Sequence, residues 1–209
     1  DTFQPCFGPD PTITNHYMFS FDTLDLGLID YPEALVIQNR LVSEVSCGVK
    51  NNTLILCEHK PAITLGRQAN EKNILKPKGH LLKSGINIFK VSRGGDVTMH
   101  MPGQLVAYPV FDLKQWECDL HKFLRAQEEA VMLLLEGYGI TGQRRKRNTG
   151  VWVKGKKVAS IGIAVNRWVT SHGLSLNVDC NLDLFSLIRP CGQDIMMTSI
   201  SEILSQDRI

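Results

Sequence analysis

Apolar residues recur at helical spacing in two parts of the chain. After Pro32 they stand three or four residues apart, at Ala34, Ile37, Leu41 and Val45. The second stripe follows Asp119, a residue type that caps helix N-termini, and stops before Gly137 and Gly139. Its members are Leu120, Phe123, Leu124, Val131, Leu134 and Leu135. This spacing gives each segment one apolar face, so it predicts two amphipathic helices.

Short runs of aliphatic and β-branched residues, bounded by Pro, Gly and Asn, predict strands elsewhere. The runs are Thr53 to Glu58, Ala62 to Leu65, Ile86 to Val91, Val151 to Val153 and Lys157 to Val165. Gly155 separates the last two, which is typical of a tight hairpin. Helices and strands in this order predict an α/β or α+β domain, with a mixed, largely antiparallel sheet flanked by helices.

Alternate side chains of the last run differ in size. Small residues at Ser160, Gly162 and Ala164 share one face with Val158, and larger residues at Ile161, Ile163 and Val165 share the other with Ala159. The face of small residues has room for a ligand or a neighbouring backbone.

Length and composition fit one soluble globular domain. The chain has 209 residues, of which 43% are hydrophobic and 21% charged. We expect residues 1–16, with three prolines and a glycine, to form an extended lead-in, and residues 17–209 to form the domain. The longest aliphatic run, Val131 to Leu135, is far shorter than the roughly 20 residues needed to span a membrane.

Charge and cysteine usage narrow the classes of function. A net charge of +2 gives no strong global field of the kind that attracts nucleic acid. The six cysteines form neither a C-x-x-C pair nor a Cys/His cluster of zinc-ligand spacing, so we expect no metal site. The chain opens without the pattern of a signal peptide, and we therefore expect reduced thiols in a cytoplasmic compartment.

The densest group of candidate functional residues runs from Arg93 to His100, as Arg-Gly-Gly-Asp-Val-Thr-Met-His. Paired glycines after a strand let backbone N–H groups converge on an anionic or carbonyl group, and Arg93, Thr98 and His100 add donors. This pattern indicates a substrate cradle. An ordinary turn with a solvated arginine and a packed histidine explains it equally well, because the spacing is not that of a phosphate loop.

Three further residues could carry chemistry. Lys157 stands at the mouth of an apolar strand, where an ammonium group stabilises a thiolate, although most hairpin lysines are plain surface residues. His172 precedes a glycine and an alternating strand, and either shapes a pocket or packs in the core. Cys191 lies between Pro190 and Gly192, on the kind of sharp turn that exposes a nucleophile, although most cysteines are inert and buried.

Taken together, these segments resemble the lipoyl(octanoyl) transferase family. The matching segments are Arg93 to His100, Gly103-Gln104, Tyr108-Pro109, Thr149 to Trp152, Lys157 to Gly162, His172 to Leu174 and Pro190 to Gly192. Each is a weak signal alone, but their order and spacing are specific. The likeness extends from about residue 24 to residue 204.

The resemblance implies the fold shared by lipoate and biotin protein ligases, and a Cys/Lys dyad that works through a covalent thioester intermediate. By position, Cys191 would be the acyl-accepting nucleophile and Lys157 the residue that lowers its pKa. The acyl and substrate pocket would be lined by Arg93, Gly94, Gly95, Asp96, Val97, Thr98, Met99, His100, Ser160, Ile161, Gly162, Gly173, Leu174 and Ser175.

The implied reaction passes an octanoyl group from octanoyl-acyl carrier protein to the lysine of a lipoyl domain, in lipoate biosynthesis and protein lipoylation, without a cofactor. The implied acceptors are the lipoyl domains of 2-oxoacid dehydrogenase E2 subunits and the glycine-cleavage H protein. The compartment would be the cytoplasm, or a mitochondrion or plastid in a eukaryote.

Two alternatives belong to other classes of function. An ATP-dependent lipoate or biotin ligase would activate a free acid as an acyl-adenylate, but such ligases do not rely on a Pro-Cys-Gly thiol. A catalytically silent acyl-binding protein would need neither Cys191 nor Lys157, and both are present.

The chain departs from the family pattern at two positions, and it also carries one run of basic residues. Met101 stands where glycine is usual, so it could narrow the acyl pocket or restrict the loop, and either would change the preferred chain length rather than the reaction. Ser175 stands where alanine is frequent, which we expect to be tolerated. The run Arg144, Arg145, Lys146 and Arg147 precedes the segment that leads to Lys157. We expect it to help dock an acidic carrier protein, a solvated loop being the alternative.

Overall fold

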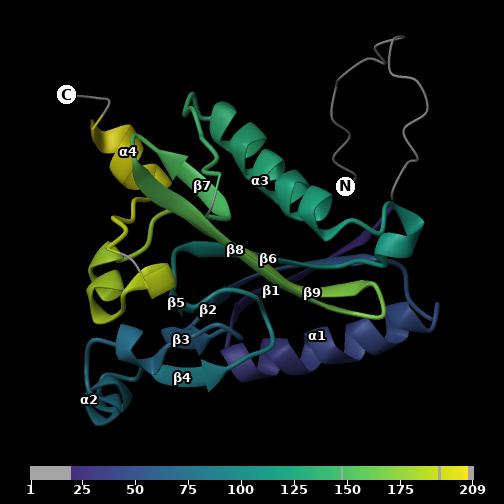
Figure 1. Cartoon of the computed structure of the whole chain (residues 1–209), viewed down its shortest axis with the longest axis horizontal. Helices are drawn as coiled ribbons and strands as arrows, with labels where there is room; N and C mark the ends of the chain where they lie inside the picture. The colour runs from purple at the N-terminus through teal and green to yellow at the C-terminus, as the bar shows by residue number, and fades with distance from the viewer. Residues whose placement is uncertain (1–19, 147, 193, 207–209) are drawn as a thin grey trace.

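The computed structural model describes residues 20–146, 148–192 and 194–206 (Figure 1). Within them the strands form two sheets. The larger has six strands in the order β1 (Asp22–Ile29), β2 (Thr53–His59), β6 (Gln104–Val110), β9 (Val169–Asn177), β8 (Lys156–Asn166) and β7 (Gly150–Val153). The smaller has the order β4 (Asn87–Lys90), β3 (Ala62–Leu65) and β5 (Val97–His100). The predicted lead-in at residues 1–16 lies outside the described residues.

The strand pairing matches the predicted mixed, largely antiparallel arrangement. Only the pairs β1–β2 and β3–β4 are parallel among the described strand pairs, and the others are antiparallel. The fold class is therefore confirmed, although the strands are divided between two sheets where one was expected. Strands β7 and β8 form the predicted hairpin, whose turn residues Lys154 and Gly155 both have positive φ, as a tight two-residue turn requires.

Helices cover both faces of the larger sheet (Figure 1). Helix α1 (Tyr31–Ser46) packs against β6 and β9 on one face, and α3 (Leu120–Glu136) packs against β7, β8 and β9 on the other. Both predicted helices are thus confirmed. The carboxylate of Asp119 accepts hydrogen bonds from the backbone N–H groups of His121 and Lys122, which is the predicted N-cap.

The remaining helices are short. They are α2 (Lys78–Lys83) beside the smaller sheet, α4 (Ile200–Gln206) at the end of the described chain, and the 3₁₀ turns η1 (Glu71–Asn73), η2 (Leu113–Gln115), η3 (Leu182–Leu187) and η4 (Pro190–Gly192). No helix of the described chain is both long and apolar enough to cross a membrane.

Separate apolar clusters hold these layers together. One joins α3 and α4 to β7 and β8 through Val131, Leu135, Val158 and Ile203. A second fills the space between the smaller sheet, α2 and η3, and a third lies between α1 and the larger sheet. A cavity lined by residues from both sheets and from α3 lies among these layers.

Candidate active site

A cavity of about 510 Å³ lies where the loop 93–96, strands β8 and β9, and the turn η4 meet. All but one of the predicted pocket residues line it: Arg93, Gly94, Gly95, Asp96, Val97, Thr98, His100, Ser160, Ile161, Gly162, Gly173, Leu174 and Ser175. Lys157 and Pro190 also line it, so the cavity reaches both the predicted lysine and the turn that carries Cys191. Segments that are almost 100 residues apart in the sequence therefore share one site.

Met99 is the exception, and Met101 does not line the cavity either. Both side chains are fully buried in the second apolar cluster, beside Ile63 and Leu65, and neither lines the cavity. In strand β5 alternate side chains point to opposite faces, so Thr98 and His100 reach the cavity while Met99 points into the core. Met101 does not line this cavity, because its side chain is part of the core, and its effect on chain-length preference stays a prediction.

The arginine of the glycine-rich loop is buried. Its Nε and Nη2 atoms donate to the Oγ1 of Thr64, at 3.2 and 2.9 Å, and Nη2 also donates to the carbonyl oxygen of Thr64 at 2.8 Å. Nη1 donates to the carbonyl oxygen of Gly94 at 3.0 Å. The solvated-arginine alternative is therefore wrong, because Arg93 ties the loop to strand β3 and brings a positive charge under the cavity.

Two glycines allow backbones to approach each other beside the cavity. A Cβ on Gly162 would lie 2.9 Å from the carbonyl oxygen of Gly94, and one on Gly173 would lie 2.1 Å from that of Ala107. The Gly94 N–H also donates to the carbonyl oxygen of Ile163 at 2.8 Å. The small residues predicted on one face of β8 thus leave room for the cavity and for a neighbouring backbone.

Lys157 is buried, with only 2% of its surface exposed. Its ammonium nitrogen lies 5.0 Å from the centre of the Trp152 ring, an arrangement that favours the charged form of a lysine. The neighbouring strand leaves no spare room: a Cβ on Gly150 would come within 2.6 Å of Lys157 Cε and 3.2 Å of its Nζ. The surface-lysine alternative is therefore wrong for Lys157. Lys156, by contrast, points away and pairs with Glu202 on α4 at 2.8 Å.

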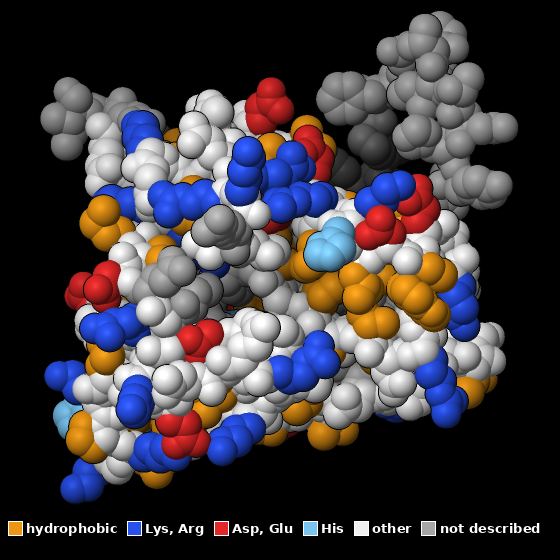
Figure 2. Space-filling view, viewed as in Figure 1, with side chains coloured by type: hydrophobic (Ala, Val, Ile, Leu, Met, Phe, Trp, Pro, Cys, Tyr) orange, Lys and Arg blue, Asp and Glu red, His pale blue; other side chains and the backbone are white. Residues whose placement is uncertain are grey.

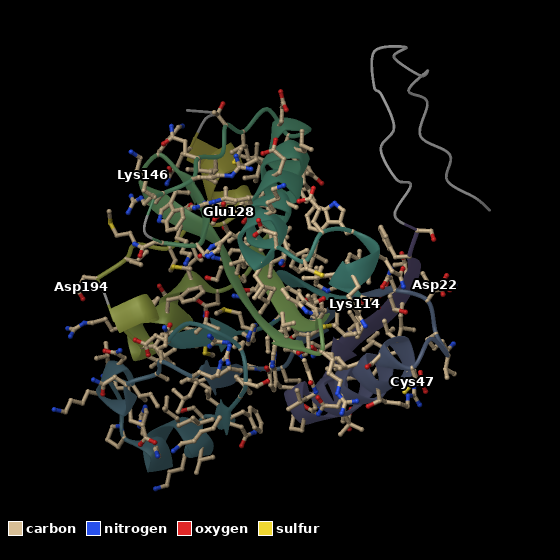
Figure 3. The ribbon with its side chains drawn as sticks, turned by 45° about the vertical axis from the view of Figure 1, so that its right-hand side comes forward. Asp22, Cys47, Lys114, Glu128, Lys146 and Asp194 are labelled. Carbon is tan, nitrogen blue, oxygen red and sulfur yellow. The ribbon has the colours of Figure 1, made fainter. Side chains whose placement is uncertain are left out.

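Glu128, labelled in Figure 3, lies on α3 and supports the strand that packs on Lys157. Its carboxylate is fully buried and accepts the Gly150 N–H at 3.0 Å. Arg125 at 2.5 Å and Arg144 at 3.2 Å neutralise it. Because Gly150 packs on the Lys157 side chain, Glu128 links helix α3 to the position of the lysine. Sequence reasoning did not single out Glu128, because a glutamate in a helix usually faces solvent.

The turn η4 brings Pro190 into the cavity wall. The structure describes the backbone of this turn but not the side chain of Cys191. Gly192 has a φ of +65°, the left-handed conformation that glycine adopts readily. The segment after the turn pairs with β8: the Lys157 N–H donates to the carbonyl oxygen of Met196 at 2.8 Å, and the Thr198 N–H donates to that of Lys157 at 2.9 Å. The chain beyond Cys191 is thereby attached to the strand that carries the lysine.

A buried group of aromatic and histidine side chains closes one end of the cavity. Tyr31, His100, Tyr108 and His172 line it, and His59 lies behind them. The Tyr31 ring stacks on His100 at 5.6 Å, and the Tyr108 hydroxyl lies 2.7 Å from His59 Nε2. His172 lines the cavity and also packs against Tyr31 and Ser92, so both alternatives for it apply. Tyr31 and His59 were missed, because they lie far from the glycine-rich motif in the sequence.

Burial keeps these groups neutral. Desolvation lowers the pKa of His172 to about 4, and the charge of Arg93 acts in the same direction. The pKa of His100 is also lowered by burial, then by His59 and Arg93, and that of His59 is lowered by burial. Burial raises the pKa of Tyr31 to about 12. This end of the cavity therefore offers uncharged hydrogen-bonding groups near neutral pH.

The basic run lies in the segment before β7. Figure 2 shows Lys and Arg side chains in a band across the upper part of this face, over α3 and that segment. Arg144 pairs with Glu128 and Glu129, and Arg145 lies over the Trp152 ring and donates to the carbonyl oxygen of Gly155. Lys146 is exposed. Arg147, the last member of the predicted run, lies outside the described residues.

The family description "Lipoyl protein ligase A/B catalytic domain" matches residues 30–208, which include every segment that lines the cavity. The chain belongs to this family.

Relatives with assigned functions agree with this membership. An octanoyltransferase of Geotalea uraniireducens is 47% identical over 169 residues, which are 81% of this chain and 76% of the relative. An octanoyltransferase of Solibacter usitatus is 45% identical over 178 residues, which are 85% of this chain and 81% of the relative.

Solved structures support the fold. A lipoate-protein ligase A bound with ATP has a TM-score of 0.73 at 17% identity, over 86% of this chain and 76% of that chain. A biotin protein ligase from Aquifex aeolicus has a TM-score of 0.52 at 17% identity, over 88% of this chain and 61% of that chain. At such low identity the likeness establishes the shared fold alone. The predicted fold of lipoate and biotin protein ligases is confirmed.

Proposed function

We propose that the chain is an octanoyltransferase that carries the acyl group on the thiol of Cys191. The observation that carries the proposal is the cavity itself, because a buried lysine, Lys157, and the turn of Cys191 border the same space of about 510 Å³. A volume in this range suits a medium-length chain together with the group that carries it. The relatives named as octanoyltransferases supply the identity of the acyl group.

The proposed reaction proceeds in two exchanges. The Cys191 thiolate attacks the carbonyl carbon of an octanoyl thioester, an acyl–sulfur bond to the enzyme forms, and the donor leaves as its thiol after taking up a proton. The amino group of an acceptor lysine then attacks the same carbon, an amide forms, and the Cys191 thiol is regenerated. Because one thioester replaces another in the first step, no nucleotide needs to be consumed.

Lys157 is suited to assist the first step. As an ammonium ion on the cavity wall it favours the thiolate form of a nearby thiol. Stacking over Trp152 supports the charged form of the lysine, whose own side chain is buried. Lys157 therefore acts on the protonation state of Cys191 in this proposal.

The thiols of Cys57 and Cys180 are poorly suited to the role of nucleophile. Burial raises the pKa of Cys57 to about 12 and that of Cys180 to about 11. Both remain protonated near neutral pH, and neither lines the cavity. Cys47 and Cys118 are exposed and also lie outside the cavity lining.

The cavity walls divide between apolar and polar groups. Val97, Leu124, Ile161, Ile163 and Leu174 provide apolar surface for an acyl chain. The end formed by Tyr31, His100, Tyr108 and His172 provides uncharged donors and acceptors, which suit the thioester or the amide. We assign Met99 to the core and the other predicted pocket residues to these walls.

The proposed donor and acceptor rest on the resemblance to the lipoyl(octanoyl) transferases, and the charge of the surface supports the donor. We propose an acyl carrier protein as donor, since carrier proteins of this kind are acidic and the band of Lys and Arg residues lies on this face of the molecule (Figure 2). We propose lipoyl domains of 2-oxoacid dehydrogenase E2 subunits, and the glycine-cleavage H protein, as acceptors.

The test is to mix the protein with octanoyl-acyl carrier protein, without ATP, and to measure the intact mass and the modified peptide. The expected result is a gain of one octanoyl group on Cys191, which disappears when a lipoyl domain is added, as that domain gains the group. In the matched arm the protein receives octanoate and ATP instead. Modification of the lipoyl domain in that arm alone would identify an ATP-dependent ligase, and no modification in either arm would contradict the proposed transfer.

A further inference from the structure

We infer that Asp96, together with Asn73, is a positioning pair that fixes the turn carrying Cys191. The inference rests on the proposed function, because it gives the turn its role. It concerns a different property, however, which is the placement of the turn rather than the identity of the nucleophile. Asp96 lines the cavity, and Asn73 lies beside it in η1; both are far from Lys157 in the sequence.

The first part of the arrangement is a hydrogen-bonded connection between the glycine-rich loop and η1. Asp96 Oδ2 accepts a hydrogen bond from Asn73 Nδ2 at 2.5 Å, and Oδ1 accepts the Asn70 N–H at 3.0 Å. Asn70 in turn caps η1 by accepting the Lys72 N–H at 3.0 Å. The Asp96 carboxylate is therefore occupied by two donors from one short element, so the substrate-binding role first assigned to it is not needed to explain its geometry.

The second part connects this pair to the turn. The carbonyl oxygen of Asn73 accepts the Arg189 N–H at 2.7 Å, and the Gly192 N–H closes the turn onto the Arg189 carbonyl at 3.1 Å. A Cβ on Gly192 would lie 3.1 Å from Asp96 Oδ2 and 3.2 Å from Asn73 Nδ2. The turn thus packs directly on the Asp96–Asn73 side-chain pair, which would have to shift by a few tenths of an ångström to admit a Cβ at Gly192.

The opposite side of the turn has a contact of a different kind. Arg189 forms an ion pair with Asp194 at 2.9 Å, with 45% and 89% of their side chains exposed. Exposed ion pairs contribute little to the stability of a fold. Asp194 is therefore a matched control for Asp96: both are carboxylates beside the same turn, but Asp194 is exposed and accepts from the Arg189 side chain, whereas Asp96 accepts from Asn70 and Asn73 of the neighbouring element.

The Asp96 side chain has two opposite effects on Cys191: its hydrogen bonds help to place the turn, but its negative charge opposes the formation of a thiolate there. A carboxylate next to Gly192 disfavours a thiolate on the adjacent residue, by the general repulsion of like charges. An asparagine at position 96 carries no charge but keeps its oxygen as an acceptor for the Asn70 N–H. Its NH₂ group can donate to the Asn73 oxygen if the Asn73 side-chain amide flips. Asp96→Asn and Asp96→Ala therefore separate the geometric contribution from the electrostatic one.

The experiment measures two quantities in Asp96→Ala, Asn73→Ala, Asp96→Asn and the control Asp194→Ala. One is kcat and KM for octanoyl transfer, and the other is the pH dependence of the alkylation of Cys191 by iodoacetamide, followed on the modified peptide. Thermal unfolding shows which variants are folded at the assay temperature. We expect Asp96→Ala and Asn73→Ala to lower kcat about tenfold or more with little change in KM, because a misplaced reacting group loses rate steeply.

The conservative variant Asp96→Asn should differ from the alanine variants in both measured quantities. Asp96→Asn is expected to recover most of kcat, and to shift the alkylation profile of Cys191 by roughly half a pH unit or more toward lower pH. The inference is overturned if Asp96→Ala matches Asp194→Ala in kcat, if Asp96→Asn is as slow as Asp96→Ala, or if the alkylation profile does not move. If Asp96→Ala does not fold, the Asp96→Asn profile decides alone. Full transfer by a Cys191→Ser variant would instead contradict the proposed function, without changing the alkylation test.

Discussion

Lys157 and Cys191 border one cavity but are held by different kinds of structure. Lys157 belongs to β8, an 11-residue strand with partners on both sides, and its side chain is enclosed by Trp152 and Gly150. Cys191 belongs to a three-residue 3₁₀ turn that packs on a pair of polar side chains. Packing therefore fixes the lysine, whereas a few hydrogen bonds fix the turn.

This difference separates two kinds of consequence. A change at the lysine removes charge and buried volume together, so it should lower the free energy of unfolding as well as activity. A change at the turn should alter the chemistry and leave most of the unfolding free energy intact.

The largest effect is expected on octanoyl transfer in Cys191→Ser and Lys157→Met. Serine generates an alkoxide far less readily than cysteine generates a thiolate at neutral pH, and methionine fills the lysine's space without its charge. Both variants should lose about a thousandfold or more in kcat/KM, measured with octanoyl-acyl carrier protein. In Lys157→Met the alkylation of Cys191 should also require a higher pH.

The contrast appears in the stability of a third variant. Lys157→Ala should lower the free energy of unfolding by about 2 kcal/mol, because it leaves a cavity beneath Trp152, while Cys191→Ser should change it by less than about 0.5 kcal/mol. Lys156→Ala serves as the control, since Lys156 faces Glu202 and not the cavity. Full activity in Cys191→Ser, or an unchanged alkylation profile in Lys157→Met, would contradict the dyad.

The next largest effect is expected at Glu128. Glu128→Ala leaves the Gly150 N–H without its acceptor and removes the carboxylate that Arg125 and Arg144 neutralise. Loss of one partner from a buried charge group typically costs about 3 kcal/mol or more, which chemical denaturation would measure. Glu128→Gln keeps an acceptor for Gly150 and should cost less. Equal stability of Glu128→Ala and wild type would show that Gly150 and Lys157 do not depend on α3.

The elements that sequence could predict are those whose own residues determine them. The stripes after Pro32 and Asp119 and the hairpin at Gly155 are local patterns, and each became the expected helix or turn. Strand β1 was missed, because its residues are mostly exposed or half-buried and it pairs with only one neighbour. The split of the strands into two sheets follows from long-range pairing, which no short window of sequence contains.

The site shows the same division. Ordered motifs located the glycine-rich loop, Lys157 and the turn of Cys191, which the cavity brings together. Tyr31, His59 and Glu128 were missed because their roles come from contacts with distant residues. Met99 was placed in the pocket because a motif was treated as a unit, although strand alternation turns every second side chain away.

A smaller effect, on stability, is expected from the histidines that close the cavity. The pKa of His172 is about 4 in the folded protein, below its ordinary value, so the unfolded chain binds a proton first as the pH falls. Stability is complete above about pH 6.5 and decreases as the pH falls toward 4, by about 3 kcal/mol for this residue.

His172→Asn removes this proton uptake and tolerates the positive φ of 56° at that position. The difference in unfolding free energy between pH 7 and pH 4.5 should therefore be smaller in the variant, by about 2 kcal/mol. His59 and His100 titrate in the same direction and remain in both proteins. An identical pH dependence in the two proteins would show that His172 is not kept neutral by burial.

The smallest effect is expected at the basic band, and the structure narrows it to Lys146. Arg144 and Arg145 have partners within the protein, so reversing their charges would disturb the fold and blur the result. Lys146 is exposed beside them. Lys114, an exposed lysine whose nearest acidic partner is Asp112 at 3.7 Å, lies on another part of the surface (Figure 3). Lys146→Glu should raise KM for octanoyl-acyl carrier protein roughly two- to fivefold at low salt, with kcat little changed, because the attraction between opposite charges speeds encounter. The effect should shrink as salt rises, since exposed charges are screened over about 10 Å at 0.1 M.

Lys114→Glu makes the same change in net charge away from the band and should leave KM near the wild-type value. Equal KM values for both variants at low salt would identify the segment before β7 as a solvated loop, and would leave the contrast between the lysine and the turn untouched.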